Sequence, residues 1–361
     1  MHALVIGGGV AGAATAVALR SIGVDVTICE ARSRDAKDAG LWLGVASNGL
    51  NALQALGLRD VVLDASLVDP RTGAGGRSGS APIRRADLYG LLRDAAVAGG
   101  ARIAHDRKLV AADSAAGHVV ARFADGSALS GDLLIGCDGI HSRTRSIIDP
   151  EAPSPRYIPL LNVGGFSTGA DAPGEPARLQ FVPGKKGFFG YTTSADRREA
   201  WWFANLPWAT EPSRDELAAA TRASLSGTLL QTFADAPPHV RDMIRATRTE
   251  LYALPTYDLP GVPTWWRDNM IIIGDAAHAT TPTSGQGASL ALEDAVVLAK
   301  CLRDLPTWPE AAVRYERLRR ERVEGVVALS ARASSTKLTD ASIEHSLEWV
   351  HTYRVDWTTP V

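Results

Sequence analysis

Short apolar runs, separated by glycines and by a helix-like stretch, dominate the start of the chain. Residues 3–6 and 24–29 are rich in apolar and β-branched side chains, which is typical of buried strands in a parallel sheet. Between them, residues 11–21 are rich in alanine and favour a helix that Gly23 would end. The pattern therefore predicts a strand–turn–helix–strand unit.

The chain up to residue 154 continues with helices and short strands. We expect helices over residues 48–56 and 85–98, and strands over 102–105, 109–113, 119–123 and 133–135. The Asp125–Gly126 turn is expected to join the last two of these strands in a hairpin. Residues 70–80 contain spaced glycines without a preceding strand or a following apolar helix, so we interpret them as a loop and not as a second nucleotide motif.

A second type of pattern begins near residue 155, where Gly, Pro and aromatic residues become frequent. Strand-like alternation over 178–182, 188–193 and 200–205 indicates an antiparallel sheet, followed by helices over 213–234 and 237–247. A buried strand over 270–273 and helices over 286–304, 309–335 and 339–350 complete the chain. The sequence thus predicts an α/β protein with a discontinuous first domain (1–154 and 265–335), a second lobe (155–264) and a C-terminal helix and tail (336–361).

Composition and charge exclude several classes of protein. With 361 residues, 45% hydrophobic and 22% charged, the chain has room for a large cofactor in two lobes. The formal net charge of −2 gives no reason to expect nucleic acid or an anionic membrane as a partner, and no apolar stretch is long enough to predict a transmembrane helix. Cys29, Cys137 and Cys301 are far apart, so we expect reduced thiols in a cytoplasmic protein and no metal site. Separately, we expect a monomer or weak homodimer.

The most informative motif is the glycine pattern after the first strand, Gly7-x-Gly9-x-x-Gly12. Gly7 would allow the tight turn, Gly9 the approach of a pyrophosphate to the helix N-terminus, and Gly12 the close packing of helix on sheet. Glu30, at the end of the second strand, could accept hydrogen bonds from ribose hydroxyls. This Rossmann-like motif predicts a dinucleotide site without separating FAD from NAD, and the acidic residue 30 disfavours a 2′-phosphate.

Two further segments carry candidate chemistry. Asp275 follows a buried strand, Pro282 lies in the loop after it, and a long helix begins near Gly287. A carboxylate there could bind a polyol, and the helix N-terminus could stabilise a negatively charged ring; taken singly, Asp275 could equally be a cap and His278 a packing residue. The other segment runs from residue 136 to 145 and, in isolation, could be a simple Asp138–Gly139 turn.

Together and in this order, the three segments resemble the single-component (group A) FAD-dependent aromatic hydroxylases, with a p-hydroxybenzoate hydroxylase-like fold. The resemblance covers the FAD-binding domain, with its three-layer, mostly parallel sheet, and not residues 155–265. It implies bound FAD, NAD(P)H as a transient co-substrate, and O₂. The implied reaction is hydroxylation of an aromatic or polycyclic (polyketide- or indole-like) small molecule through a flavin C4a-hydroperoxide. Oxidative decarboxylation, epoxidation, Baeyer–Villiger oxidation and dehydrogenation in secondary metabolism are the alternatives on the same fold.

The resemblance also implies roles for single residues in cofactor binding. Val10 and Ala11 would line the pyrophosphate turn, and Glu30 would hold the adenosine ribose with Arg32 beside it. Arg85 would reach the cofactor, with Arg84 as a less favoured substitute, and Leu109 would touch the adenine region by its backbone. Asp275 would bind the ribityl chain, Gly287 and Ala288 would offer N–H groups to the flavin pyrimidine edge, and Pro282 would lie at the oxygen-reacting face. Asp138 and Arg145 would support fold and cofactor, and Ser289, where many members carry Asn, would slightly alter a flavin contact.

The substrate pocket is expected between the flavin and the second-lobe sheet. Alternation places Trp201, Phe203 and Asn205 on one face of a strand, and Phe189 and Tyr191 on one face of its neighbour. The candidate pocket residues are Tyr191, Trp201, Phe203, Asn205 and Pro282, with Trp42 at the flavin border. The alternative is that these aromatic rings only fill the core between the lobes. No pair of acidic residues or His–Asp pair marks a general base, so the catalytic residues stay unassigned.

Overall fold

The computed structural model describes residues 1–35, 40–67, 80–115, 117–176, 178–220, 222–259, 261–335 and 348–361. At the centre of the larger lobe lies a six-stranded sheet with the order β15-β16-β9-β1-β2-β5. Its strands are β1 (His2–Ile6), β2 (Asp25–Cys29), β5 (Arg102–Ala104), β9 (Leu133–Gly136), β15 (Trp266–Arg267) and β16 (Met270–Ile272). All neighbouring strands are parallel except β15 and β16. The predicted α/β architecture with a mostly parallel sheet is confirmed.

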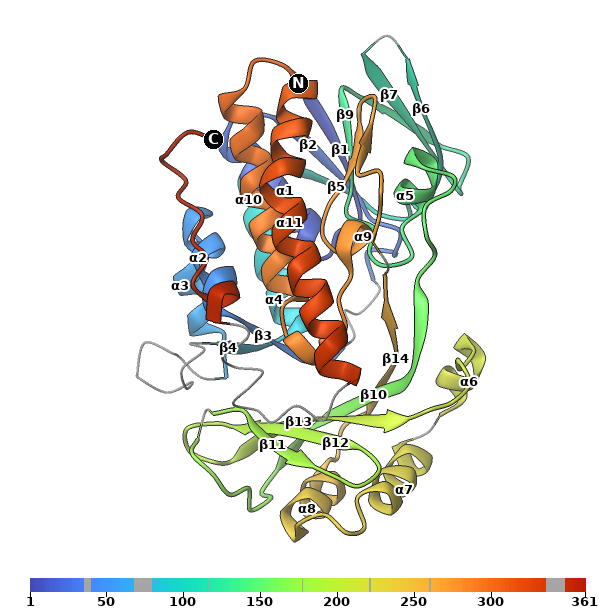
Figure 1. Cartoon of the computed structure of the whole chain (residues 1–361), viewed down its shortest axis with the longest axis vertical. Coiled ribbons are helices and arrows are strands. Elements are labelled where there is room, and N and C mark those ends of the chain that lie inside the picture. The colour runs from blue at the N-terminus through green and yellow to red at the C-terminus, as the bar shows by residue number, and fades with distance from the viewer. Residues whose placement is uncertain are drawn as a thin grey trace.

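Helices pack against this sheet and against one another, and they bring distant segments of the chain together (Figure 1). The helices are α1 (Val10–Ser21), α2 (Ser47–Ala55), α3 (Arg59–Asp64), α4 (Arg85–Ala98), α10 (Gly287–Asp304) and α11 (Trp308–Ser335). Helix α1 packs against α4 and α10, and α10 packs against α2 and α11. Fully buried alanines such as Ala14 and Ala18 let α1 lie close to its neighbours. A three-stranded sheet of β6 (Leu109–Ala115), β7 (His118–Phe123) and β8 (Ala128–Gly131) forms the third layer, with α5 (Arg143–Ile148) beside it.

The smaller lobe is built on a five-stranded antiparallel sheet in the order β11-β12-β13-β10-β14 (Figure 1). Its strands are β10 (Arg156–Thr168), β11 (Gln180–Pro183), β12 (Phe188–Thr193), β13 (Glu199–Pro207) and β14 (Tyr252–Asp258). Helices α6 (Arg214–Ala219), α7 (Arg222–Thr232) and α8 (Pro238–Ala246) follow β13, and α7 and α8 contribute to a separate core on one face of the sheet. The opposite face is directed toward the larger lobe, where Leu41 would collide with any Cβ at Gly164 (2.5 Å).

One strand pairing differs from the expectation. The Asp125–Gly126 turn joins β7 to β8, a strand that the sequence pattern did not predict, and not to the strand at residue 133. That strand, β9, lies between β1 and β16 in the central sheet. Its residues are buried on both faces, as a central parallel strand requires, whereas the β7–β8 hairpin has exposed positions.

Several other elements were missed or merged. The longest strand, β10, contains Pro159, Gly164 and Gly165, which resemble strand breakers in the sequence. The helix expected over residues 213–234 is divided into α6 and α7, because Ala220 is extended (ψ 112°). The short pair β3 (Trp42–Val45) and β4 (Ala81–Arg84), helix α3 and strand β14 were also not predicted. Residues 70–79 of the expected loop and most of the expected helix over 339–350 lie outside the described residues.

Candidate functional site

The turn after β1 has no room for side chains at two of its glycines. Gly7 has a φ of +100°, and a Cβ there would lie 2.6 Å from the Cys137 carbonyl oxygen. A Cβ at Gly12 would lie 1.8 Å from the carbonyl oxygen of Gly7. A Cβ at Gly9 would meet nothing within 4 Å, so this position faces open space. Gly9 offers no side-chain cap to α1, and the N-terminal N–H groups at Val10 and Ala11 are suited to bind an anion.

Glu30 is held beside this turn by backbone groups. Its Oε2 accepts a hydrogen bond from the Gly8 N–H (2.7 Å), and its Oε1 accepts one from the Arg32 N–H (2.9 Å). The Arg32 side chain is exposed. The Arg107 N–H donates to the Glu30 carbonyl (2.8 Å), which brings the start of β6, at Leu109, to the same edge of the sheet. A carboxylate fixed in this way keeps lone pairs for hydroxyl donors of a ribose.

The second motif meets the first in space, although the two are far apart in the sequence. Helix α9 (Asp275–His278) follows Gly274, whose Cβ position lies 3.1 Å from the Cβ of Ala11. A Cβ built at Gly287 would lie 3.7 Å from Oδ1 of Asp275, so the Asp275 carboxylate stands beside the start of α10. Two helix N-termini and one carboxylate therefore lie at one edge of the larger lobe.

Asp275 lies deep in the protein and yet reaches solvent. Its side chain is exposed, but the surrounding protein raises the pKa of its carboxyl by desolvation, which the nearby His278 and Arg85 partly offset. We use the term opening for the place where this carboxylate, exposed and yet desolvated by the surrounding protein, meets solvent. The Arg85 charge acts on Asp275, which places Arg85, the first residue of α4, on the same opening.

Several polar atoms near this opening lack a protein partner. The Arg85 Nε, Ser284 Oγ and Gln286 Nε2 atoms are buried and make no hydrogen bond within the described residues. Helix α10 begins without a side-chain cap, with Gly287 and Ala288 in its first turn, and Pro282 lies exposed in the short helix η2 (Pro282–Ser284) just before it. Buried polar groups without partners are rare in folded proteins and call for a ligand or water. A cofactor with phosphates, hydroxyls and a polar ring fits this set of groups.

Ser289 and Asp138 act within the fold. The Ser289 side chain is fully buried, and its Oγ accepts a hydrogen bond from the Ala46 N–H (3.1 Å), which ties α10 to the residues after β3. Asp138 accepts hydrogen bonds from the Ser142 hydroxyl (2.5 Å) and the Thr144 N–H (2.9 Å). Arg145 donates to the carbonyl of Ala276 in α9 (2.9 Å). The third motif therefore braces the segment that carries Asp275.

A buried cluster of charges lies behind the N-terminus of α10, and the sequence analysis did not identify it. Arg319 donates to Asp294 Oδ1 (2.7 Å) and to Glu293 Oε2 (2.6 Å), and Arg322 makes two hydrogen bonds to Glu293 (2.8 and 2.7 Å). His278 Nε2 lies 2.5 Å from Asp294 Oδ2. Burial would raise the pKa of Asp294, but His278 and Arg319 overcome this and hold it below its ordinary value. The available signal was a pair of acids in the mostly apolar first two thirds of α10, matched by two arginines three residues apart.

The sheet of the smaller lobe presents an aromatic face to the larger lobe. Trp201 and Phe203 lie on this face, and Trp42 of β3 contacts both, with ring centres 6.4 and 5.8 Å apart. Asn205 shares the face, and its Oδ1 accepts a hydrogen bond from Asn162 Nδ2 (2.6 Å). Trp201, Phe203 and Asn205 thus share one face of β13, as alternation predicts, and Trp42 joins this face from the larger lobe.

Tyr191 lies on the opposite face of the smaller-lobe sheet. In the register of β12 and β13 it is opposite Trp202, on the face that packs against α7 and α8. Its hydroxyl donates to the carbonyl of Pro173 (2.8 Å), and its ring contacts His239. The structure therefore does not bring Tyr191 together with Trp201 and Phe203, because neighbouring strand residues point to opposite faces.

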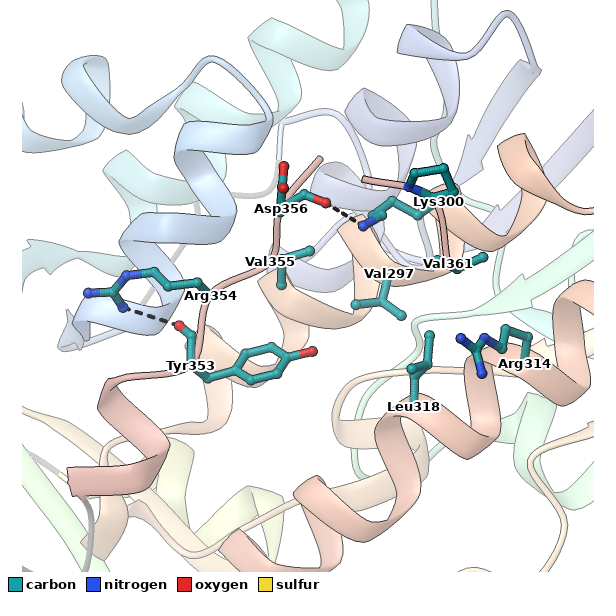
Figure 2. Close-up of a pocket in the computed structure, with 10 residues that line it drawn as sticks. Val297, Lys300, Arg314, Leu318, Tyr353, Arg354, Val355, Asp356 and Val361 are labelled. Atoms are coloured by element: carbon teal, nitrogen blue, oxygen red, sulfur yellow. Dashed lines mark hydrogen bonds between the residues drawn. The ribbon is translucent and has the colours of Figure 1, made fainter. Parts of the chain in front are cut away.

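A pocket at the other end of α10 is separate from this site. Figure 2 shows it between α10, α11 and the C-terminal segment, with Lys300, Arg314, Tyr353 and Asp356 among its lining residues. It shares no residue with the glycine turn or with Asp275.

Within the described residues, no group of three or more His, Cys, Asp or Glu side chains is arranged to hold a metal ion. None of the helices that the structure describes is long and apolar enough to span a membrane.

Comparison with known proteins agrees with this geometry. The model of the FAD binding domain family matches residues 1–330. The chain is 30% identical to the FAD-dependent urate hydroxylase of Mycolicibacterium vanbaalenii, over 91% of this chain and 86% of that protein. It is also 30% identical to the aurachin C monooxygenase/isomerase of Stigmatella aurantiaca, over 91% and 88% of the two chains. Among solved structures, Klebsiella pneumoniae HpxO in complex with FAD and uric acid superposes with a TM-score of 0.80 at 26% identity, covering 98% of this chain and 93% of that one.

Proposed function

Because the chain belongs to the group A FAD-dependent aromatic hydroxylases and takes FAD as its cofactor, we propose that it uses NAD(P)H and O₂ to insert one oxygen atom into an aromatic or polycyclic small molecule. One observation carries the proposal. The opening lined by Asp275 and the N-terminus of α10 belongs to the same lobe as β3, whose Trp42 contacts the aromatic face of the smaller lobe. A redox cofactor and a planar substrate could then lie next to each other.

The described residues support a definite division of roles toward FAD. The N-terminus of α1, at Val10 and Ala11, would bind the pyrophosphate, and Glu30 the adenosine ribose, near Arg32 and the backbone of Leu109. Asp275 would accept hydrogen bonds from the ribityl hydroxyls, and Arg85 would balance charge beside it. The N–H groups of Gly287 and Ala288 would meet the polar edge of the ring. Bound FAD supplies electron transfer from NAD(P)H and the activation of O₂.

The protein itself contributes electrostatics and shielding. Helix α10 is 18 residues long and begins without a side-chain cap, so its N-terminus stabilises nearby negative charge by about 0.3–1 kcal/mol, or more where it is partly buried. The aromatic side chains of Trp42, Trp201 and Phe203 exclude water from the substrate side. Pro282 lies exposed before α10, at the candidate oxygen-reacting face. No described residue is assigned as a general base.

The substrate we propose is planar and aromatic. Trp201 and Phe203 would form its wall, and the Asn205 amide would contact a polar substituent. The related HpxO structure with FAD and uric acid holds a planar heteroaromatic compound, which supports this class of substrate. Residues 155–264 would then be the substrate lobe, residues 1–154 and 265–335 the FAD lobe, and residues 336–361 a C-terminal extension of it.

A substrate screen tests the proposal. Consumption of NADH and NADPH is followed with aromatic, indole and polyketide compounds, and products are analysed by mass after reaction under ¹⁸O₂. We expect at least one compound to accelerate NAD(P)H oxidation and to gain one labelled oxygen atom. Product formation without the label would indicate dehydrogenation or decarboxylation and would contradict the proposed monooxygenation.

Two further properties complete the proposal. The dependence on NAD(P)H and the three unpaired, buried cysteines suit a reducing compartment, so we place the enzyme in the cytoplasm. We also propose a monomer or a weak homodimer. Light scattering across a range of protein concentrations would test the second point.

A further inference from the structure

Two neighbouring arginines at the junction of β4 and α4 serve different sides of the site. Arg85 acts on Asp275 at the cofactor opening, whereas Arg84, the last residue of β4, reaches the sheet of the smaller lobe. The Arg84 guanidinium carbon lies 4.7 Å from the ring centre of Phe166 and 5.3 Å from that of Trp201. In the β3–β4 pair, Arg84 stands directly opposite Trp42. One cation therefore lies among rings that come from both lobes.

These rings form one continuous surface, which we call the aromatic wall: Trp42, Phe166, Trp201 and Phe203. Phe166 and Trp201 are in edge contact (5.3 Å), and Trp42 contacts Trp201 and Phe203. Strand pairing places Trp201 opposite Phe166 on the same face of the sheet. A guanidinium held against aromatic rings keeps its charge and its planar donors available to a ligand that stacks on the same rings.

Glu199, the protein partner of Arg84, forms only a weak ion pair with it. Its NH2 atom lies 3.7 Å from Glu199 Oε2, and the two side chains are 44% and 42% exposed. The same Glu199 oxygen accepts a hydrogen bond from Trp201 Nε1 (3.1 Å). An exposed ion pair at this distance contributes at most about 1 kcal/mol. By contrast, Arg156 and Asp258 on the same sheet are 2.5 Å apart. Arg84 can therefore exchange Glu199 for another anion at little cost.

Two polar atoms beside the aromatic wall also point to a ligand at this place. The Trp42 Nε1 atom is buried and has no hydrogen-bond partner within the described residues, and the same holds for Thr192 Oγ1. Thr192 pairs with Trp201 across the β12–β13 ladder, so its hydroxyl is on the face of the wall. Buried donors without a partner are expected where a polar ligand or water completes the hydrogen bonds. Both atoms can donate to an acceptor on a substrate.

We propose that Arg84 is a specificity-determining residue that selects a planar aromatic anion, with its charge on a carboxylate or an ionised ring hydroxyl, and that Glu199 is the internal anion which the substrate replaces. The aromatic body stacks on the wall, and the anionic group takes the place of Glu199 at the guanidinium. This assignment names the substrate class for the proposed function and rests on it. Arg84 touches the substrate, whereas Arg85 acts on the Asp275 carboxylate at the cofactor site.

Binding to the oxidised, FAD-loaded enzyme tests this inference without turnover. The probes are benzoate, 2-hydroxybenzoate, 2-naphthoate and indole-3-carboxylate, each matched with its neutral primary amide, and the readout is the flavin visible difference spectrum. We expect the acids to bind more tightly than the amides. Arg84→Gln should raise Kd for the acids about tenfold or more and leave Kd for the amides unchanged. Arg84→Lys should give an intermediate value, since it keeps charge and loses the planar donors.

Glu199→Gln gives the discriminating result. If Glu199 competes with the substrate anion, its neutralisation lowers Kd for the acids several-fold; if the Arg84–Glu199 pair only braces the sheet, Kd rises or stays the same. Arg198→Gln is the matched control, because it removes an exposed charge from the neighbouring position. The absence of any preference for acids over amides, including no binding of either, overturns the inference. If acids bind in an Arg84-dependent manner but ¹⁸O₂ label never enters a product, the proposed reaction fails and the binding assignment stands.

Discussion

The buried charge cluster behind α10 leads to a quantitative prediction for Glu293→Gln. The Glu293 side chain is fully buried and accepts hydrogen bonds from Arg319 (2.6 Å), Arg322 (2.8 and 2.7 Å) and Asn48 (2.7 Å). Glutamine keeps the size of the side chain but removes its charge, so Arg322 loses the carboxylate that it binds and Arg319 keeps only Asp294. Breaking a buried ion pair in this way costs about 3–5 kcal/mol.

The expected fall in melting temperature follows from the size of the protein. Unfolding entropy is about 2 cal/mol/K per residue, so over 361 residues a loss of 3–5 kcal/mol lowers Tm by about 4–7 °C. Far-UV circular dichroism of the FAD-loaded enzyme measures this shift. FAD affinity should also fall modestly, because Asn48, a partner of Glu293, also donates to Gln286 (3.0 Å), the residue before α10.

Glu324→Gln is the matched control for this prediction. Glu324 pairs with Arg320 at 2.9 Å on the surface of α11, and its side chain is 48% exposed. An exposed pair contributes about 0–1 kcal/mol, so this variant should melt within about 1 °C of the parent protein. If Glu293→Gln also melted within that range, the cluster would not stabilise the fold, and our account of how α10 is held would be wrong.

Three further predictions concern the cofactor site. Asp275→Ala should purify with little FAD, as judged by the ratio of flavin to protein absorbance, because the ribityl chain loses its carboxylate acceptor; full occupancy would contradict the role given to Asp275. FAD affinity should weaken as the pH falls through the raised pKa of Asp275, since protonation removes an acceptor, whereas the apoprotein loses stability as the pH rises through that value; Asp275→Asn should abolish both trends in titrations at several pH values. Gly12→Ala should give no FAD-loaded protein, because its Cβ would lie 1.8 Å from the Gly7 carbonyl oxygen, and measurable flavin binding would show that the turn can relax.

Local signals explain why the start of the chain was predicted so well. The β1–α1–β2 unit depends on apolar runs and on glycines whose roles are steric and local, as Gly7 and Gly12 demonstrate. The same local reasoning did not predict strand β10, because Gly164 resembles a strand breaker in the sequence. In the structure that glycine is required by a tertiary contact, since Leu41 of the other lobe leaves no room for a Cβ. A requirement imposed by a residue more than a hundred positions away cannot be identified from a local pattern.

The burial of the charge cluster and the direction of the Arg84 side chain could not be predicted from the sequence, for a related reason. Glu293, Arg319 and Arg322 are charged residues on helices, which ordinarily face solvent. They are buried here because α2, α11 and the C-terminal segment surround α10: Arg322 also donates to the carbonyl of Val350 (2.9 Å). The direction of Arg84 likewise depends on how the β3–β4 pair packs against the smaller lobe, and the pattern of a single sequence contains no information on that packing.

Strand β3 connects the two halves of the site physically. Trp42 at its start belongs to the aromatic wall, and Ala46, just after its end, donates its N–H to Ser289 in the first turn of α10. Ser289 is fully buried, and a Cβ at Gly49 would lie 2.6 Å from its Oγ, so any side chain at residue 49 would collide with Ser289 and displace α2 from α10. The serine therefore fixes the distance between the helix N-terminus and the wall. A substrate that stacks on Trp42 is positioned relative to α10 through this short, closely packed connection, and the spacing between cofactor and substrate is set by packing that neither of them touches.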